Sequence, residues 1–195
     1  MPLSDAERWD ARYRQQGSLY TRTEPAPFLV ACAPYLPTQG RALDLACGAG
    51  RNALFLARRG LQVLGVDISE AGLRLAQARA RAQGLSLWLV RADLTRFGLP
   101  PATFDVVVNL YYLERRLFPL IRSVLRPGGW LVFESFTQEE RKQRPEIPPD
   151  YLLAPGELRA AFADWEIIVY REGVVRGCSG RLKAIASLLA RVPEG

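Results

Sequence analysis

The 195-residue sequence contains no histidine. This absence excludes a Ser-His-Asp relay and any histidine-ligated metal, so acid–base chemistry would have to use a carboxylate, a tyrosine, a cysteine or water. Cysteine is also scarce, because Cys32, Cys47 and Cys178 are too few and too dispersed for a CxxC zinc pair, and an odd number forms no closed set of disulfides. The sequence therefore predicts a protein without a metal site, in the reducing cytoplasm.

Long apolar runs are absent as well, and none approaches the roughly 18 to 20 residues of a membrane span. The segment Met1–Asp10 is polar and unlike a signal peptide, so we expect no membrane association. Lysine is nearly absent: the 26 basic residues are 24 Arg and 2 Lys, with a net charge of +6. The basic residues are spread along the chain, which is more typical of solvated surface than of a nucleic-acid site, so nucleic acid is possible but not favoured as a partner.

Short apolar runs alternate with amphipathic stretches from Gly40 onward. Strands are expected in RALDLAC, LQVLGVD, LSLWLVRAD, FDVVVNLYY and WLVFESF, with helices in NALFLARRG, Glu70–Ala82 and Leu113–Leu125 and a turn at residues 126–129. Alternating strands and helices predict a parallel sheet, and the Val- and Leu-rich strands predict that helices cover both of its faces.

The second half of the chain has a different composition. Residues 137–154 are charged and rich in proline, so we expect a long loop that acts as a substrate lid. A helix is expected with Pro155 at its first position. The runs EIIVYREG and LKAIASLLARV, joined through Gly173, Gly177 and Gly180, predict an antiparallel hairpin at the sheet edge.

The N-terminal segment predicts a helix that begins after Ser4, because Ser4 and Glu7 have the spacing of a capping box. Trp9 and Tyr13 then share one helical face. A second, apolar helix is expected around residues 28–35. We therefore expect one domain over residues 1–195, with a helical arm (1–36) over the ligand site and an α/β core (37–195).

The segment from Asp44 to Asn52, DLACGAGRN, follows the first predicted strand and precedes the first core helix. Small residues at such a bend let backbone amides approach a ligand, and the helix N-terminus favours negative charge. A Walker loop is excluded because no Lys-Ser/Thr follows. Gly48 and Gly50 with Ala53 in the third place leave a dinucleotide site open, and Asp67, 23 residues after Asp44, could accept hydrogen bonds from a ribose.

Four segments in order resemble the successive motifs of class I S-adenosylmethionine-dependent methyltransferases: DLACGAG, Asp67 after VLGV, Ala92-Asp93-Leu94, and FDVVV followed by Asn109. The first motif departs from the family pattern at Ala46, where a glycine is usual. YTRT at 20–23, GAGRNALFLA, PGEL at 155–158 and DWE at 164–166 resemble the tellurite-resistance and small-molecule branch. The resemblance implies a Rossmann-like three-layer sandwich whose seven-stranded sheet is mostly parallel with an antiparallel last strand.

The same resemblance implies that S-adenosylmethionine is the cofactor and S-adenosylhomocysteine its product. The residues expected to bind it are Asp44, Ala46, Gly48, Gly50, Asn52, Asp67, Ile68, Ala92, Asp93, Leu94 and Asn109 from the core, and Trp9 and Tyr13 from the arm. Alternatives remain for several of them: Asp67 could cap the next helix, Asp93 could close an Asx turn, and Trp9 and Tyr13 could be core cover.

No catalytic residue is assigned, and the candidates for the acceptor side are Arg22, Tyr111, Tyr112 and Glu134. The run Asn109-Leu110-Tyr111-Tyr112 lacks the two prolines of the Asn-Pro-Pro-aromatic signature of amino-group methylases, which disfavours that substrate class.

We therefore expect a methyltransferase acting on a small molecule, such as a thiol or a chalcogen oxyanion, which needs no strong base. It would act as a monomer or homodimer. The alternatives are an RNA or protein methyltransferase that uses Arg141–Arg144, an NAD-linked enzyme, and a non-catalytic protein that retains the fold.

Overall fold

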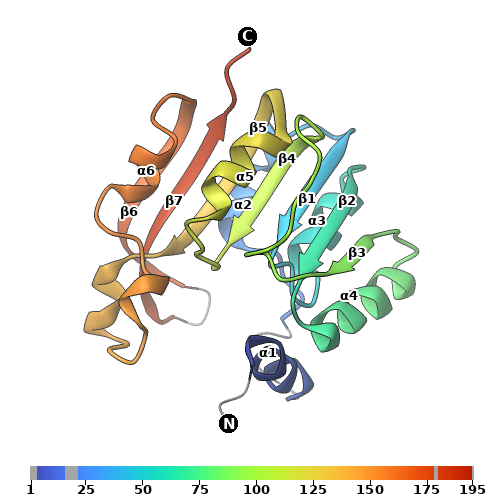
Figure 1. Ribbon diagram of the computed structural model, residues 1–195, viewed down its shortest axis with the longest axis horizontal. Coiled ribbons are helices and arrows are strands. Elements are labelled where there is room, and N and C mark those ends of the chain that lie inside the picture. The colour runs from blue at the N-terminus through green and yellow to red at the C-terminus, as the bar shows by residue number, and fades with distance from the viewer. Residues whose placement is uncertain (1–3, 16–21, 178–179, 195) are drawn as a thin grey trace.

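The computed structural model describes residues 4–15, 22–177 and 180–194. Over these residues the chain forms a seven-stranded sheet in the order β3-β2-β1-β4-β5-β7-β6 (Figure 1). The strands are β1 Arg41–Leu45, β2 Gln62–Asp67, β3 Trp88–Arg91, β4 Phe104–Leu110, β5 Leu125–Phe136, β6 Glu166–Arg176 and β7 Leu182–Arg191. Strand β7 pairs antiparallel with both β5 and β6, whereas every other neighbouring pair is parallel. The predicted sheet, with its last strand reversed, is confirmed.

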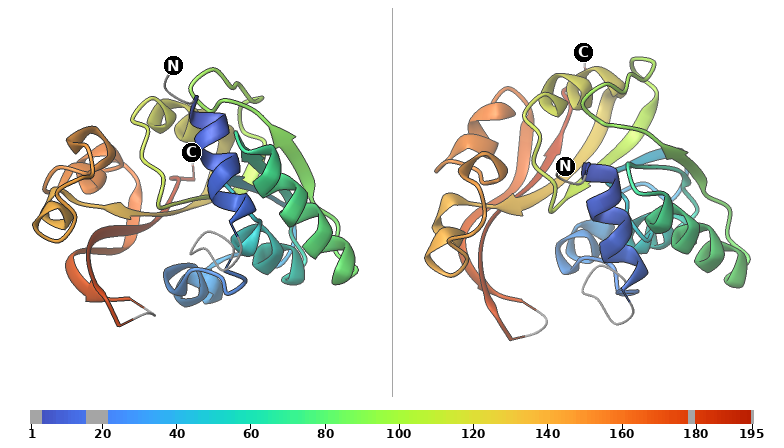
Figure 2. Two further views of the ribbon diagram at one scale, coloured as in Figure 1. Left: turned by 90° about the horizontal axis from the view of Figure 1, so that it is seen from below. Right: turned by 60° about the horizontal axis from the view of Figure 1, so that its bottom comes forward.

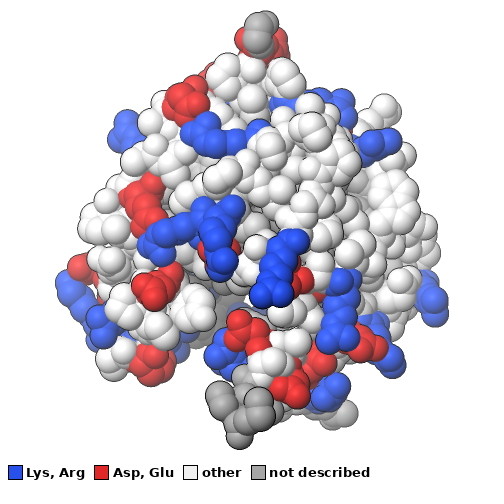
Figure 3. All heavy atoms as spheres, in the orientation of Figure 1, with Lys and Arg blue, Asp and Glu red and all other residues white. Residues whose placement is uncertain are grey.

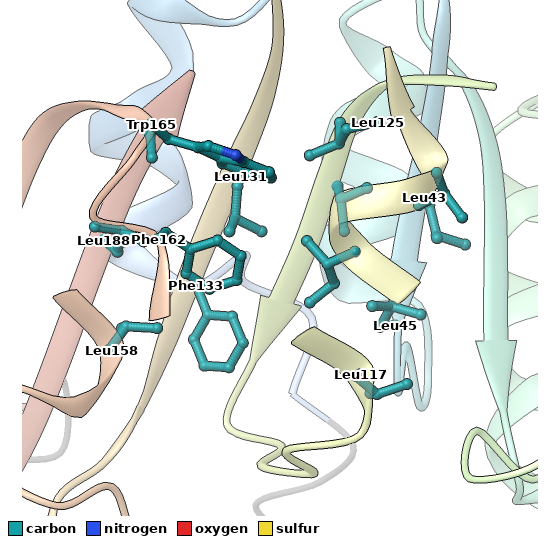
Figure 4. Packing of buried hydrophobic residues seen from close by; sticks show 14 of the residues in the cluster. Leu43, Leu45, Leu117, Leu125, Leu131, Phe133, Leu158, Phe162, Trp165 and Leu188 are labelled. Atoms are coloured by element: carbon teal, nitrogen blue, oxygen red, sulfur yellow. The ribbon is translucent and has the colours of Figure 1, made fainter. Parts of the chain in front are cut away.

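Helices cover both faces of this sheet, as the apolar strands predicted. Helices α2 (Pro27–Cys32), α3 (Arg51–Arg58) and α4 (Glu70–Ala82) pack with Val106, Val108 and Val132 on one face. Helices α5 (Leu117–Val124) and α6 (Glu157–Ala161) pack with Leu43, Val107 and Leu131 on the other (Figure 4). The molecule is thus a three-layer sandwich with two apolar cores, and the predicted bounds of α4 are those observed.

Several predicted element boundaries are wrong. Helix α6 begins at Glu157 because Gly156, with φ of 71°, is its N-cap, so Pro155 lies outside the helix. Helix α5 begins at Leu117, four residues later than expected. The predicted turn at residues 126–129 lies within β5, where the pairing with β4 shifts register. Gly173 also lies within β6, paired with Ile185, so the connection between β6 and β7 is shorter than expected.

Residues 137–154 form two short 3-10 helices, η3 (Gln138–Lys142) and η4 (Pro149–Tyr151). The Glu140 side chain is 1% exposed; its Oε2 accepts a hydrogen bond from the Ala184 amide at 2.7 Å, and its Oε1 accepts one from Arg144 Nε at 2.8 Å. Leu152 and Leu153 are fully buried. This segment is therefore packed against the start of β7, and its action as a substrate lid stays a prediction.

Helix α1 (Asp5–Arg14) begins with the predicted capping box, in which Ser4 and Glu7 exchange hydrogen bonds. It lies beside α4, across the end of the sheet where the parallel strands finish (Figure 2). Among the described residues no helix combines the length and apolar character that crossing a bilayer requires.

Candidate functional site

The loop after β1 turns through three left-handed residues, Ala46 (φ 52°), Gly48 (φ 53°) and Gly50 (φ 78°). It is closed by hydrogen bonds from the Cys47 amide to the Val66 carbonyl and from the Gly50 amide to the Cys47 carbonyl. A left-handed alanine costs roughly 1 kcal/mol, so Ala46 stores strain where the family usually places glycine. The loop therefore presents backbone amides at the carboxyl end of the sheet, where open α/β sheets bind ligands.

Asp67 connects this loop to the end of β2. Its Oδ2 accepts a hydrogen bond from the Gly48 amide at 2.7 Å and its Oδ1 accepts one from the Ser69 amide at 2.8 Å. The side chain is 7% exposed, and burial raises the pKa of its carboxyl while the backbone donors oppose that rise. The N-cap of α4 is Ser69, so Asp67 is not the residue that caps this helix.

Two buried acceptors at the ends of β1 and β4 have unused capacity. Asp44 is 1% exposed, and burial, the largest cause, raises the pKa of its carboxyl to about 7. Asn109 is equally buried and donates through Nδ2 to the Tyr112 carbonyl at 2.7 Å. Within the described chain, Asp44 Oδ2 and Asn109 Oδ1 have no hydrogen-bond partner. Because such atoms are costly to bury unpaired, the site fits a ligand with an ammonium or hydroxyl donor, as S-adenosylmethionine has.

Helix α1 is docked against this site by Asp10, a residue that the sequence analysis missed. Asp10 is 8% exposed, and its Oδ1 accepts hydrogen bonds from Ser69 Oγ at 2.6 Å and from the Ala71 amide at 3.0 Å. It thus serves the N-terminus of α4 as a second cap. No sequence signal could have found it, because the partners lie 59 and 61 residues away.

The two aromatic residues of α1 differ in position. A Cβ built on Gly48 would lie 2.0 Å from the Tyr13 hydroxyl oxygen, and the Tyr13 ring also lies against Gly72. Tyr13 therefore covers the glycine loop directly. The Trp9 ring lies 6.2 Å from the Tyr13 ring and 4.6 Å from the Arg12 guanidinium, so a cation already stands over it.

Other predicted cofactor-binding residues have structural roles around the site. Asn52 is buried and accepts a hydrogen bond from the Ala26 amide at 3.0 Å, which ties the segment before α2 to α3. A Cβ on Gly50 would lie 2.7 Å from the Ala76 Cβ, so this glycine lets α3 and α4 approach. Leu94 belongs to the apolar core. The exposed Asp93 forms the Asx turn that was the alternative, since its Oδ1 accepts from the Thr95 amide at 2.9 Å. Ile68 and Ala92 are half-buried.

Of the candidate acceptor residues, the structure joins Tyr111 and Glu134 directly. Tyr111 has φ of 63° and donates its hydroxyl proton to Glu134 Oε1 at 2.6 Å. Burial raises the pKa of Tyr112 to about 12, and carboxylates including Glu114 and Asp93 add to that rise. The Arg22 carbonyl accepts a hydrogen bond from Arg79 at 3.3 Å. Tyr20 and Thr21 of the branch motif lie outside the described residues. No group of three or more His, Cys, Asp or Glu in the described chain could hold a metal.

Comparison with known proteins is consistent with this geometry. Residues 42–129 match the family described as "Methyltransferase domain". Demethylmenaquinone methyltransferase of Thermus thermophilus is 38% identical over 104 residues, which are 49% of this chain and 47% of that protein. The chain spans about half the length of the curated relatives it matches.

Two solved structures share the fold over most of the chain. One, from work on the conversion of a disulfide bond into a thioacetal group during echinomycin biosynthesis, has a TM-score of 0.76 and 25% identity, over 98% of this chain and 94% of that one. TehB from Haemophilus influenzae has a TM-score of 0.71 and 23% identity, over 84% of this chain and 61% of that one. Together with the strand order, the left-handed loop and the acidic residue that holds it, these matches show that the chain is similar to S-adenosylmethionine-dependent methyltransferases, in residues 42–129 by sequence and over most of its length by fold.

Proposed function

We propose that this protein transfers a methyl group from S-adenosylmethionine to a small molecule. The observation that carries the proposal is the Asp67 carboxylate, which joins the Gly48 amide of the β1 loop to the end of β2 at the ligand-binding end of the sheet. Buried Asp44 and Asn109 supply acceptors near the ends of β1 and β4, and Tyr13 covers the loop. When bound, the cofactor supplies an electrophilic methyl group.

The residues of this chain would act mainly by positioning and by excluding water. The glycine loop and Asp67 would orient the cofactor, and Tyr13 would shield it from solvent. The sequence contains no histidine, so direct displacement onto an acceptor that needs little base catalysis suits these residues. The printed name of the Thermus relative and the echinomycin structure both concern small molecules, which supports a small acceptor here.

A large acceptor such as RNA is less well supported. The basic run at residues 141–144, which would have to hold it, is engaged within its own segment: Lys142 pairs with Glu139, and Arg144 pairs with buried Glu140 and lies 4.3 Å from the Phe136 ring. We therefore propose the small-molecule branch, with tellurite and thiols as acceptors suggested by the family resemblance.

Calorimetric titration with S-adenosylmethionine, S-adenosylhomocysteine and NADH tests the cofactor. We expect micromolar binding of the first two and at least a tenfold loss, about 1.4 kcal/mol, in Asp67→Ala. Asp164→Ala, which removes an exposed carboxylate paired with Arg122, is the control and should bind like the native protein. Binding of NADH alone, or of none of the three ligands, would contradict the proposal.

A further inference from the structure

We infer that the methyl acceptor is an organic acid, whose anionic group binds beside Tyr111 at a subsite formed with Lys183 and Arg51. This inference rests on the proposed methyl transfer, because it names the chemical class of the acceptor. The observations that carry it are the constrained position of one aromatic side chain, the buried carboxylate that holds it, and the cations around it.

Tyr111 is held in a conformation that bulky residues rarely adopt. It follows β4 directly, at the ligand-binding end of the sheet, with φ of 63°. Its amide donates a hydrogen bond to the Glu134 carbonyl at 2.7 Å, and its hydroxyl donates to Glu134 Oε1 at 2.6 Å. Strained residues persist only where their surroundings hold them, and they concentrate at ligand sites. The phenol is therefore fixed in one orientation.

Glu134 is a positioning residue, because its side chain is buried and hydrogen-bonded within the protein. Its side chain is 2% exposed, and its Oε2 accepts hydrogen bonds from Ser187 Oγ at 2.6 Å and from Arg171 at 3.4 Å. Both carboxylate oxygens are thus occupied by groups of the protein. Because Arg171 pairs with Glu134, the charges of these two groups largely offset each other.

Two further cations stand close to the Tyr111 ring. The Lys183 ammonium lies 4.8 Å from the ring centroid, and the Arg51 guanidinium carbon lies 5.9 Å from it. Lys183 stands at the start of β7, beside the end of β5, whereas Arg51 opens α3 directly after the glycine loop. The subsite therefore lies between the glycine loop and the segment of residues 137–154. Figure 3 shows that the face of the molecule seen in Figure 1 is hollowed in its lower part, below a group of Lys and Arg side chains.

The charges around the subsite favour a negative ligand. The other buried carboxylate nearby, Glu140, pairs with Arg144, which lies over Phe136 next to Tyr111. Each of these two buried carboxylates thus has its own arginine, and the two cations on the Tyr111 ring, Lys183 and Arg51, are different side chains from those arginines. Arg51 also interacts electrostatically with the Asp44 carboxyl, so Lys183 makes the larger contribution to binding an anion.

An acidic acceptor also fits the chemistry that the chain can perform. A carboxylate held by Lys183 would orient the acceptor toward the glycine loop without taking part in the displacement. In the displacement the nucleophile of the acceptor forms its bond to the methyl carbon as the carbon–sulfur bond breaks and its electron pair returns to sulfur. Any proton on the nucleophile leaves to water.

Paired small thiols test the subsite in the presence of S-adenosylhomocysteine, which prevents turnover. The probes are 3-mercaptopropionate and its amide, 3-mercaptopropionamide, which differ in charge but little in size. We expect calorimetric titration to show about tenfold tighter binding of the acid to the native protein. The preference should fall to about twofold in Lys183→Met and return in Lys183→Arg, with the affinity for S-adenosylhomocysteine unchanged.

Arg58→Met is the matched control, because it removes one positive charge from the exposed far end of α3 and should keep the full preference for the acid. Equal binding of the two thiols, binding of neither, or a preference that survives Lys183→Met would overturn the inference. An equal loss in Arg58→Met would also overturn it, because net charge alone would then explain the effect. Failure to bind S-adenosylhomocysteine would instead contradict the proposed function.

Discussion

At the scale of single residues, the site depends on carboxylates whose surroundings give them different tasks. Both carboxylate oxygens of Asp67 accept hydrogen bonds from backbone amides, and Asp10 of α1 binds the N-terminus of α4. Asp44 Oδ2 has no hydrogen-bond partner in the described chain. Sequence analysis identified Asp44 because it begins the glycine-rich segment, and Asp67 because it follows the second predicted strand 23 residues later. It could not identify their hydrogen-bond partners, since these depend on which backbone groups face each carboxylate after folding.

Asp44 should make stability depend on pH. Its pKa is raised from an ordinary 3.8 to about 7, so the folded state binds a proton more tightly than the unfolded state and the Asp44 contribution to stability falls as pH rises between these values. We expect Asp44→Asn to lose less stability than the native protein between pH 5 and pH 8, by at most about 3 kcal/mol. Urea unfolding at both pH values measures this, with Asp5→Asn as the control, because the Asp5 side chain is exposed on α1. Parallel pH profiles of Asp44→Asn and the native protein would contradict it.

Gly48 should be coupled energetically to Tyr13. In Gly48→Ala the new Cβ would lie 2.0 Å from the Tyr13 hydroxyl oxygen, so the tyrosine must move off the loop. We expect weaker binding of S-adenosylhomocysteine, together with about 1 kcal/mol of backbone strain from the left-handed alanine. In Gly48→Ala/Tyr13→Ala the clash is gone and only the strain remains, so the two changes should be non-additive in a double-mutant cycle. Strict additivity in urea unfolding would show that the two residues do not touch.

At the scale of elements, α1 shows how local and distant interactions share one helix. Its start is set by the Ser4–Glu7 capping box, which the sequence predicted correctly. Its place against the site is set by Asp10 on Ser69 and Ala71, and by Tyr13 on Gly48, which the sequence could not show. The same division holds for α6, where Pro155 suggested a start that left-handed Gly156 places two residues later.

Asp10→Ala should release α1 from the core without unfolding the sheet. Hydrogen bonds to a charged group contribute about 1.5 to 3 kcal/mol, so amide exchange over residues 5–14 should become faster and S-adenosylhomocysteine should bind more weakly. Asp5→Ala is the matched control, because Asp5 lies on the same helix with its side chain 62% exposed. Equal exchange rates in the two variants would mean that other contacts dock the helix.

At the scale of the whole molecule, the carboxyl ends of β1, β2 and β4 bring the predicted motifs to one edge of the sheet, next to the packed segment of residues 137–154. A ligand at this edge would contact elements from across the sheet and should stabilise the fold as a unit. At a concentration one hundred times its Kd, S-adenosylmethionine should contribute about 2.7 kcal/mol, which raises the Tm of a protein of this size by roughly 5 to 10 °C. Scanning calorimetry measures the shift, and Asp67→Ala should show little of it. An unchanged Tm in the native protein at saturating ligand would contradict cofactor binding.

The sequence by itself determined the order of strands and helices, the capping box of α1, the bounds of α4 and the glycine loop with Asp44 and Asp67. These features depend on apolar periodicity and on residues close together in the chain. Only the tertiary structure decided that Asn52 holds Ala26, that Asp10 caps α4, and that Tyr111 is fixed by Glu134 beside Lys183. Those contacts join residues 23 to 72 positions apart in the sequence. Local sequence patterns cannot predict them, because they form only when the strands assemble in the order β3-β2-β1-β4-β5-β7-β6.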